Sequence, residues 1–177
     1  KELSRRLPEG QTTVVGNGSA CVVGSHGYVI KNGQRFIINS GAASMGYDLP
    51  AAIGACLAED RKEIICLSGD GSIQMNLQEL QTIVFHKLPI KIFVINNQGY
   101  HSMRQTQGNL FPEFITTGVG PESGDLSFPC MEKIAWAYGI PYMAVRKNSE
   151  MDAAMDKMLA TEGFAMCEIF VDTKQKF

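Results

Sequence analysis

Residues 64–99 read IICLSGDGSIQMNLQELQTIVFHKLPIKIFVINNQG. Two apolar runs, Ile64–Leu67 and Ile90–Ile95, enclose a segment in which apolar residues recur every three or four positions over 77–88. The runs predict β-strands, and the recurrence predicts an amphipathic helix with Asn76 as its N-cap. The stretch therefore predicts a strand, a crossover helix and a second strand parallel to the first.

Similar short runs, rich in β-branched residues, recur along the whole chain. The six candidate strands are Thr12–Val15, Phe36–Ile38, Ile64–Leu67, Ile90–Ile95, Met143–Val145 and Cys167–Val171. Because most of them are apolar on both faces, they suit a parallel sheet that helices cover on each side. We therefore predict an α/β fold, a three-layer α/β/α domain with a mostly parallel six-stranded sheet.

The segments between the strands carry helix and loop signals. Leu49–Ala58 predicts a helix that has Pro50 in its first turn and is almost entirely small or apolar, so we expect it to pack on both sides. Further helices are expected over Met131–Tyr138 and Met151–Leu159. Gly108–Ser127 is rich in Gly, Pro and Ser and predicts a long irregular loop, of a kind that is often functional.

The composition favours one globular domain, spanning residues 1–177. Of the 177 residues, 45% are hydrophobic and 19% are charged, so the chain can bury one sizeable core. Its length is short for two independent domains. The formal net charge of -2 gives no field that would gather nucleic acid or an anionic membrane. We therefore expect neither nucleic acid nor a membrane as a partner.

Other features predict the compartment of the chain and its origin. No apolar run approaches the roughly 20 residues that span a bilayer, and no secretory stretch follows the basic start. The five cysteines form no Cys-x-x-Cys pair, so a reduced, cytoplasmic compartment fits and zinc is not expected. Because the chain begins at Lys1 and ends abruptly at Phe177, we also expect a piece of a longer protein.

Polar clusters follow both strands of the opening stretch. Asp70 lies just after the first strand and Asn97 just after the second. Open α/β sheets bind ligands at the carboxyl ends of their strands. A carboxylate and an amide oxygen are hard ligands that suit Mg²⁺, while Gly69 and Gly71 let backbone N–H groups approach a phosphate. This combination predicts a magnesium ion that bridges the protein to a diphosphate.

The turn Gly69-Asp70-Gly71, followed by Asn96-Asn97, resembles the GDG…NN signature of thiamine-diphosphate-dependent enzymes. The similarity is to the C-terminal, diphosphate-binding domain of acetolactate synthase-like proteins. It implies that the Asp70 carboxylate, the Asn97 side chain and the backbone carbonyl of Gly99 bind Mg²⁺. The alternative is a Gly-Asp-Gly turn and an unrelated Asn-Asn loop.

A second segment is similar to the same family. Residues 40–55 read SGAASMGYDLPAAIGA and resemble the segment that precedes the GDG turn. Met45 matches the bulky apolar residue that supports the V-shaped conformer of the cofactor, a catalytic role. The resemblance also implies that backbone groups near Ala43 and Met45 hold the pyrimidine. Asp48 stands where many relatives have a small neutral residue, and we expect it to act as a helix cap.

A third segment, VGNGSA at residues 15–20, follows the first predicted strand and opens a predicted helix. A nicotinamide-binding interpretation needs an acidic residue at the end of the next strand, where Asn39 and Ser40 stand instead. The resemblance places this loop at the diphosphate. In all, it assigns cofactor binding to Gly16, Asn17, Gly18, Ser19, Ala43, Met45, Gly69, Asp70, Gly71, Ser72, Asn97, Gly99 and Tyr100.

Residues 99–107, GYHSMRQTQ, resemble the substrate side of acetolactate synthase-like proteins. Biosynthetic members of the family carry a tryptophan near the place of Thr106, so its absence leaves the acceptor substrate open. His101 is a candidate catalytic residue that faces the substrate. The alternative is an ordinary hydrogen-bonded histidine at the surface.

The resemblance implies an enzymatic function that needs a second domain. Thiamine diphosphate supplies an electron sink for the decarboxylation of a 2-oxo acid such as pyruvate, followed by carboligation to a second carbonyl compound. In the family, a glutamate of the N-terminal pyrimidine-binding domain, usually from the neighbouring subunit, activates the cofactor. No segment here resembles that domain, so we expect the chain to be inactive alone and to work in a homo-oligomer, a dimer or tetramer.

Four other interpretations stay open at this point. Two lie within the thiamine enzymes: a simple 2-oxo acid decarboxylase, and a carboligase that acts on a sugar-linked substrate. The other two are a nicotinamide-dependent oxidoreductase and a regulatory domain that keeps the fold without the chemistry.

Overall fold

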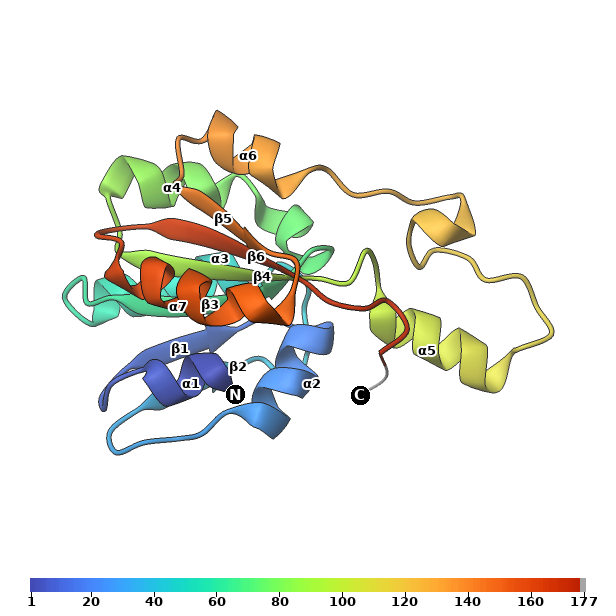
Figure 1. Ribbon diagram of the computed structural model, residues 1–177, viewed down its shortest axis with the longest axis horizontal. Coiled ribbons are helices and arrows are strands. Elements are labelled where there is room, and N and C mark those ends of the chain that lie inside the picture. Colours follow the sequence, from blue (N-terminus) through green and yellow to red (C-terminus); the bar gives the residue numbers. More distant parts are fainter. Residues whose placement is uncertain (176–177) are drawn as a thin grey trace.

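A single parallel sheet organises the molecule. The computed structural model describes residues 1–175, so the last two residues of the predicted 1–177 domain lie outside the described part. Six strands pair in the order β2-β1-β3-β4-β6-β5, all of them parallel (Figure 1). They are β1 (Thr12–Val15), β2 (Arg35–Ile38), β3 (Ile64–Gly69), β4 (Ile90–Asn96), β5 (Tyr142–Val145) and β6 (Ala165–Phe170). The predicted fold class and all six strands are confirmed.

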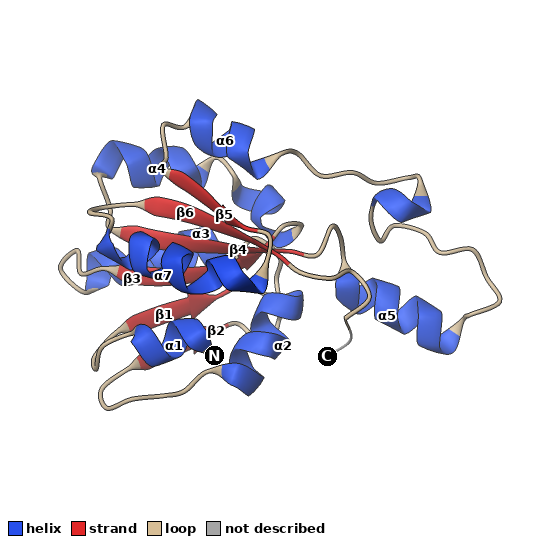
Figure 2. Ribbon diagram, in the orientation of Figure 1, coloured by secondary structure: helices blue, strands red, loops and turns tan. Residues whose placement is uncertain are grey.

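Helices cover both faces of this sheet (Figure 2). They are α1 (Glu2–Arg6), α2 (Gly18–Gly27), α3 (Asp48–Ala58), α4 (Glu79–His86), α5 (His101–Leu110), α6 (Met131–Ala137) and α7 (Met151–Ala160), with the 3₁₀ helices η1 (Ser72–Asn76), η2 (Pro121–Ser123) and η3 (Asn148–Glu150). One core lies under α3, α4 and α6, and a second lies under α1 and α7. β3 shows why both faces must be apolar, because Ile64 and Cys66 join the first core and Ile65 joins the second.

The crossover helix between β3 and β4 differs from its prediction at its start. The chain first forms η1, and α4 begins only at Glu79, with Gln78 in the N-cap position. The expectation that Asn76 caps this helix is therefore wrong. Its amide instead donates a hydrogen bond to the carbonyl of Gly46, at 2.8 Å. A tertiary contact to a segment 30 residues earlier replaces the local cap.

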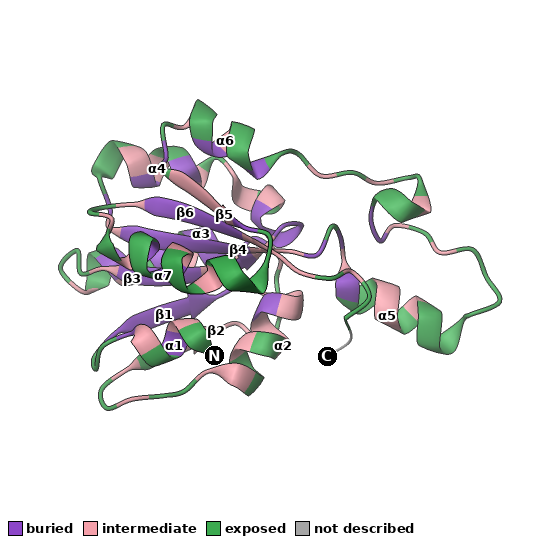
Figure 3. Ribbon diagram, in the orientation of Figure 1, coloured by how far each residue is buried: buried purple, intermediate pink, exposed green. Residues whose placement is uncertain are grey.

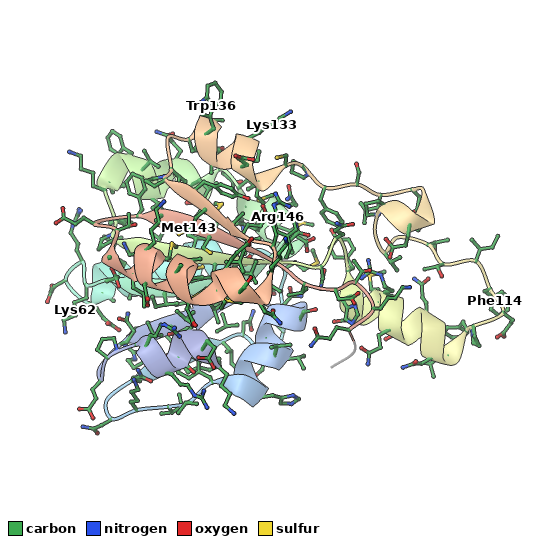
Figure 4. All side chains as sticks on the ribbon, viewed as in Figure 1. Lys62, Phe114, Lys133, Trp136, Met143 and Arg146 are labelled. Carbon is green, nitrogen blue, oxygen red and sulfur yellow. The ribbon has the colours of Figure 1, made fainter. Side chains whose placement is uncertain are left out.

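The segment after β4 contains a helix that the sequence did not predict. In α5, only His101 is buried, so the helix has no apolar stripe that a sequence pattern could reveal. The irregular segment begins after Leu110 rather than at Gly108. We call residues 101–130 the arm, because they project from the carboxyl edge of the sheet (Figure 1), with Phe114 exposed far from the strands (Figure 4).

The two faces of α3 differ in burial. Leu49, Ala52 and Cys56 are fully buried against the sheet. The opposite side exposes Gly54 and Leu57, the latter to 51%. The expectation that this helix packs on both sides therefore stays a prediction, because a single chain does not show what an assembly places on the outer side. Only the side that faces the sheet has a partner among the described residues.

The register of the central strands places the candidate site. β3 and β4 pair from Ile64 with Ile90 to Gly69 with Ile95, so both strands end at the same edge of the sheet. This central part of the sheet is buried, whereas most of the arm beyond it is exposed (Figure 3). Within residues 1–175, no helix combines the length and the apolar character needed to cross a bilayer.

Candidate functional site

The Asp70 carboxylate joins the turns that follow β3 and β4. Its Oδ1 accepts the N–H of Gly71 at 3.0 Å, and its Oδ2 accepts the N–H of Gly99 at 3.1 Å. The backbone N–H of Asp70 in turn donates to the carbonyl of Ile95, at 3.1 Å. Because of these three bonds, the two polar turns form one unit at the carboxyl edge of the sheet.

The surroundings of Asp70 favour a cation. The residue is only 3% exposed, and among the described residues no lysine, arginine or histidine forms an ion pair with it. Burial raises the pKa of Asp70 to about 6, although the N–H groups of Gly99 and Gly71 oppose this shift. A divalent cation would supply the positive charge that the buried carboxylate lacks.

Asn97 places an unpaired oxygen at the cavity that the Asp70 residue also lines. The side chain is 5% exposed, and its Nδ2 donates to Ser19 Oγ at 3.0 Å. Its Oδ1 is buried and has no hydrogen-bond partner within residues 1–175. An unsatisfied buried oxygen costs about 1–3 kcal/mol, so its presence points to a ligand that the oxygen receives from outside the chain.

The oxygen ligands of this site suit Mg²⁺ better than a metal ion that needs three or more side-chain ligands. No group of three or more His, Cys, Asp or Glu side chains in residues 1–175 could hold a metal ion. Mg²⁺ is typically bound by one or two carboxylates together with water and phosphate oxygens. One carboxylate and one amide oxygen therefore suit a magnesium ion that completes its coordination with a bound diphosphate.

A cavity of about 120 Å³ brings the predicted residues together. It is lined by Asn17, Gly18, Ser19, Met45, Gly69, Asp70, Gly71, Ser72, Asn97, Gly99, Tyr100, His101, Ser102 and Met103. The sequence predicted twelve of these residues as site residues. The other two, Ser102 and Met103, lie in the 99–107 segment that resembles the substrate side. The four sequence segments of the prediction thus meet at one place.

Two predicted cofactor residues border the cavity without lining it. Gly16 packs against Asp48, and a Cβ at Gly16 would overlap the Asp48 carboxylate. Ala43 accepts a hydrogen bond from Asn17 Nδ2 through its carbonyl, at 3.0 Å, and has a positive φ of 50°. Gly16 and Ala43 therefore contact other residues of the chain, Asp48 and Asn17, and do not line the cavity themselves.

The loop after β1 presents a helix N-terminus to the cavity. α2 begins at Gly18, whose φ of 63° favours glycine, and both Gly18 and Ser19 line the cavity. The first turn of this helix contains no acidic residue. Unpaired N–H groups and the helix dipole make such a terminus suitable for a phosphate.

Aromatic packing fixes the part of the cavity wall that Gly71 and Tyr100 form. A Cβ at Gly71 would overlap the Tyr100 ring, so only glycine allows the turn to lie this close. The Tyr100 ring meets Phe128 edge to face, with 5.5 Å between the ring centroids. Met45, the predicted support of the cofactor, is half-buried on the same cavity.

His101 lies inside the molecule and not at its surface. It is 5% exposed, and it lines both the 120 Å³ cavity and a larger, mainly apolar cavity of about 360 Å³ between α1, α2, α7 and the sheet. Burial lowers the pKa of His101, and the nearby Arg104 lowers it further. The alternative of an ordinary surface histidine is therefore wrong.

Arg104 binds backbone carbonyls of the turn after β4, a role that could not be predicted from the sequence. Its guanidinium donates to the carbonyl of Gln98 at 3.1 Å and lies 3.5 Å from that of Asn97. It also pairs with Glu122 in the arm. The only sequence signal was its place in the 99–107 segment, because an arginine that bonds to backbone carbonyls leaves no pattern.

Asp48 is also placed differently from its prediction. It is the first residue of α3, Tyr47 is in the N-cap position, and no side-chain cap bond is formed there. The expected helix cap is therefore wrong. The carboxylate is fully buried and accepts hydrogen bonds from Ser68 and Ser72, on either side of the Gly-Asp-Gly turn.

Known proteins match this chain over most of its length. The family described as thiamine pyrophosphate enzyme, C-terminal TPP binding domain, matches residues 16–169. The acetolactate synthase isozyme 2 large subunit of Escherichia coli (strain K12) is 31% identical over 172 residues, which cover 97% of this chain and 30% of that protein. The acetolactate synthase large subunit of Porphyra purpurea is 38% identical over 130 residues, covering 73% and 21%. Acetolactate synthase 2, chloroplastic, of Zea mays is 36% identical over 146 residues, covering 81% and 23%. The chain thus spans less than a third of the length of each of these relatives.

Substitution of Gly99 tests the geometry of the β4 turn. Gly99 has a φ of 150°, and a Cβ there would overlap the carbonyl oxygen of Val119. We expect Gly99→Ala to lower the free energy of unfolding by about 3 kcal/mol, from backbone strain and overpacking, as measured by urea denaturation. Gly108→Ala is the matched control, since its Cβ meets nothing within 4 Å and it should stabilise α5 by about 0.5–1 kcal/mol. Equal stability of the two variants would contradict the described turn.

Proposed function

Because this chain belongs to the thiamine pyrophosphate enzymes, as their C-terminal TPP-binding domain, we propose that it binds thiamine diphosphate through Mg²⁺ in an acetolactate synthase-like enzyme. The proposed reaction is the decarboxylation of a 2-oxo acid such as pyruvate and carboligation to a second carbonyl compound. When bound, thiamine diphosphate supplies the electron sink for the decarboxylation.

One observation carries this proposal: the buried, unpaired Oδ1 of Asn97 lines the same small cavity as the Asp70 carboxylate. Within the described residues, the Asn97 oxygen has no hydrogen-bond partner, and the Asp70 carboxylate accepts two backbone N–H groups but has no cationic partner. A magnesium ion with a diphosphate would satisfy both groups at once. The Gly99 carbonyl is the proposed third protein ligand, since Gly99 lines the same cavity as Asp70 and Asn97.

The remaining residues of the cavity have proposed positioning roles. Gly18 and Ser19, at the N-terminus of α2, would hold the diphosphate through backbone N–H groups and a hydroxyl. Met45 would support the bent cofactor conformer from the opposite segment. His101, buried and with a lowered pKa, would face the substrate as a neutral imidazole at pH 7.

The half-site interpretation is supported by the exposed apolar surfaces of the chain. The outer face of α3 exposes Leu57, and the arm exposes Phe114 to 67% and Ile115 to 90%. Apolar surface of this kind is typical of interaction sites. We propose that the N-terminal pyrimidine-binding domain, with its activating glutamate, covers part of this surface in a dimer or tetramer, and that the 1–177 chain is one domain of a longer enzyme.

The alternatives differ in what they require at the site. A nicotinamide-dependent enzyme needs an acidic residue near Asn39, which this chain lacks. A regulatory domain without chemistry has no need of the unpaired Asn97 oxygen. A simple decarboxylase and a sugar-linked carboligase share the same cofactor site. Product analysis separates the proposed enzyme from a simple decarboxylase, because pyruvate alone gives acetolactate with the former and acetaldehyde with the latter.

Removal of the Asp70 charge tests the cofactor site. We expect Asp70→Asn to weaken Mg²⁺-dependent thiamine diphosphate binding by more than about 100-fold, because the variant loses a direct ligand. Isothermal titration calorimetry, with and without Mg²⁺, measures the effect. Glu162→Gln, an equal charge change at an exposed residue, should leave binding unchanged. Wild-type binding of the cofactor that does not depend on a divalent cation would refute the magnesium site.

Turnover tests the half-site. With thiamine diphosphate, Mg²⁺ and pyruvate present, the isolated chain should consume no pyruvate, because the activating glutamate lies elsewhere. The full-length protein that carries this chain should consume it under the same conditions. A coupled assay that follows pyruvate measures both samples. Steady consumption by the isolated chain would show that its own residues complete the active site.

A further inference from the structure

Asp48 is the most deeply buried acidic residue among those that the structure describes, with an exposed fraction of 0%. Its side chain is fully buried, at the first position of α3, and no lysine, arginine or histidine of residues 1–175 forms an ion pair with it. It does not line the cofactor cavity. A buried carboxylate without a cation destabilises a fold unless hydrogen bonds compensate for the lost water. The buried Asp48 carboxylate must therefore be stabilised by its hydrogen-bond donors.

Two hydroxyl groups that flank the Asp70 turn donate hydrogen bonds to this carboxylate. Ser68 Oγ and Ser72 Oγ both donate to Oδ2, at 2.7 Å and 3.1 Å. The N–H of Leu49 donates to Oδ1, at 2.9 Å. Ser72 Oγ also accepts the N–H of Gly46, at 3.0 Å, in the turn just after Met45. One carboxylate thus links the end of β3, the start of η1 and the 40–48 segment.

The two serines that donate to Asp48 flank Asp70 in the sequence. Ser68 lies two residues before Asp70, and Ser72 lies two residues after it. Asp48 therefore holds both ends of the turn that carries the proposed metal ligand. Tyr100 packs against Gly71, so the ring and the Asp48 carboxylate both constrain this turn.

Gly16 is explained by the same contact. A side chain at this position would overlap Asp48 Oδ2, so the end of β1 can approach the carboxylate only as glycine. The strand tips of β1 and β3 are also joined directly, by the N–H of Gly16 and the carbonyl of Leu67, at 2.8 Å. Asp48 thus lies where the proposed diphosphate loop, the metal-binding turn and the segment of Met45 meet.

We propose that Asp48 is a positioning residue for the proposed cofactor site: its carboxylate clamps Ser68 and Ser72 and so holds Asp70 in the orientation that binds Mg²⁺. The inference rests on the proposed function. It assigns to Asp48 no contact with the cofactor or the substrate. Its effect passes through the two hydroxyls, so loss of the carboxylate should weaken cation binding more than it slows the chemistry at saturation.

Two variants of the full-length protein separate positioning from simple stability. Asp48→Asn keeps the size of the side chain and removes one acceptor and the charge. Ile53→Ala, on the same helix and also buried, weakens the core without touching the turn. For each, the apparent dissociation constant for Mg²⁺ is measured at saturating thiamine diphosphate, together with kcat and Tm. Amide hydrogen exchange of the 69–72 turn is measured in the cofactor-free protein.

We expect Asp48→Asn to raise the Mg²⁺ dissociation constant by about tenfold and to leave kcat at saturating Mg²⁺ within about twofold. Exchange of the Asp70 and Gly71 amides should become at least about tenfold faster. Ile53→Ala should lower Tm and change neither the Mg²⁺ affinity nor the exchange of this turn relative to the rest of the sheet. Ser68→Ala should reproduce part of the Asp48→Asn effect and add little to it in the double variant.

An unchanged Mg²⁺ affinity in Asp48→Asn would overturn the inference, whether or not the turn exchanges faster. An equal loss of affinity in Ile53→Ala would also overturn it, because a general loss of stability would then account for both variants. Failure of the wild-type protein to bind Mg²⁺ and thiamine diphosphate is a different result. It would overturn the proposed function, while the exchange comparison would still decide whether Asp48 holds the turn.

Discussion

The site depends on one buried carboxylate that bridges two strand tips. Asp70 accepts backbone N–H groups from its own turn and from the turn after β4, and it does so with almost no contact with water. Burial without a cationic side chain raises its pKa, and the adjacent Asn97 oxygen has no partner. A buried carboxylate without a cation and an unpaired amide oxygen in the same cavity both cost stability, and binding of a cation would remove that cost.

The parallel sheet is what brings these groups together. Because β3 and β4 pair in register up to Gly69 and Ile95, the residues that follow them leave the sheet at the same edge. This part could be predicted from the sequence, since apolar runs with helical spacing between them define a β-α-β unit. The loop after β1 and the 40–48 segment could be placed at the same site only by their resemblance to a family.

Other parts could not be predicted, because they depend on contacts between distant segments. Asn76 has the sequence pattern of a helix cap, yet the Gly46 carbonyl binds its amide. α5 has no apolar stripe, and its structural contribution comes from Arg104, which binds carbonyls of the β4 turn. Asp48 has the sequence position of a cap, and only the fold shows that its carboxylate binds the two serines that flank the Gly69-Asp70-Gly71 turn. Asn76 and Asp48 each had the local role of a cap available and form tertiary contacts instead.

A crystal structure of the full-length protein with Mg²⁺ and thiamine diphosphate tests the central claim most directly. The account predicts one magnesium ion at about 2.1 Å from a carboxylate oxygen of Asp70 and from Oδ1 of Asn97, with diphosphate oxygens completing its octahedron. A diphosphate bound without metal at these two side chains, or an Asn97 Oδ1 that accepts a hydrogen bond from the protein instead, would contradict it.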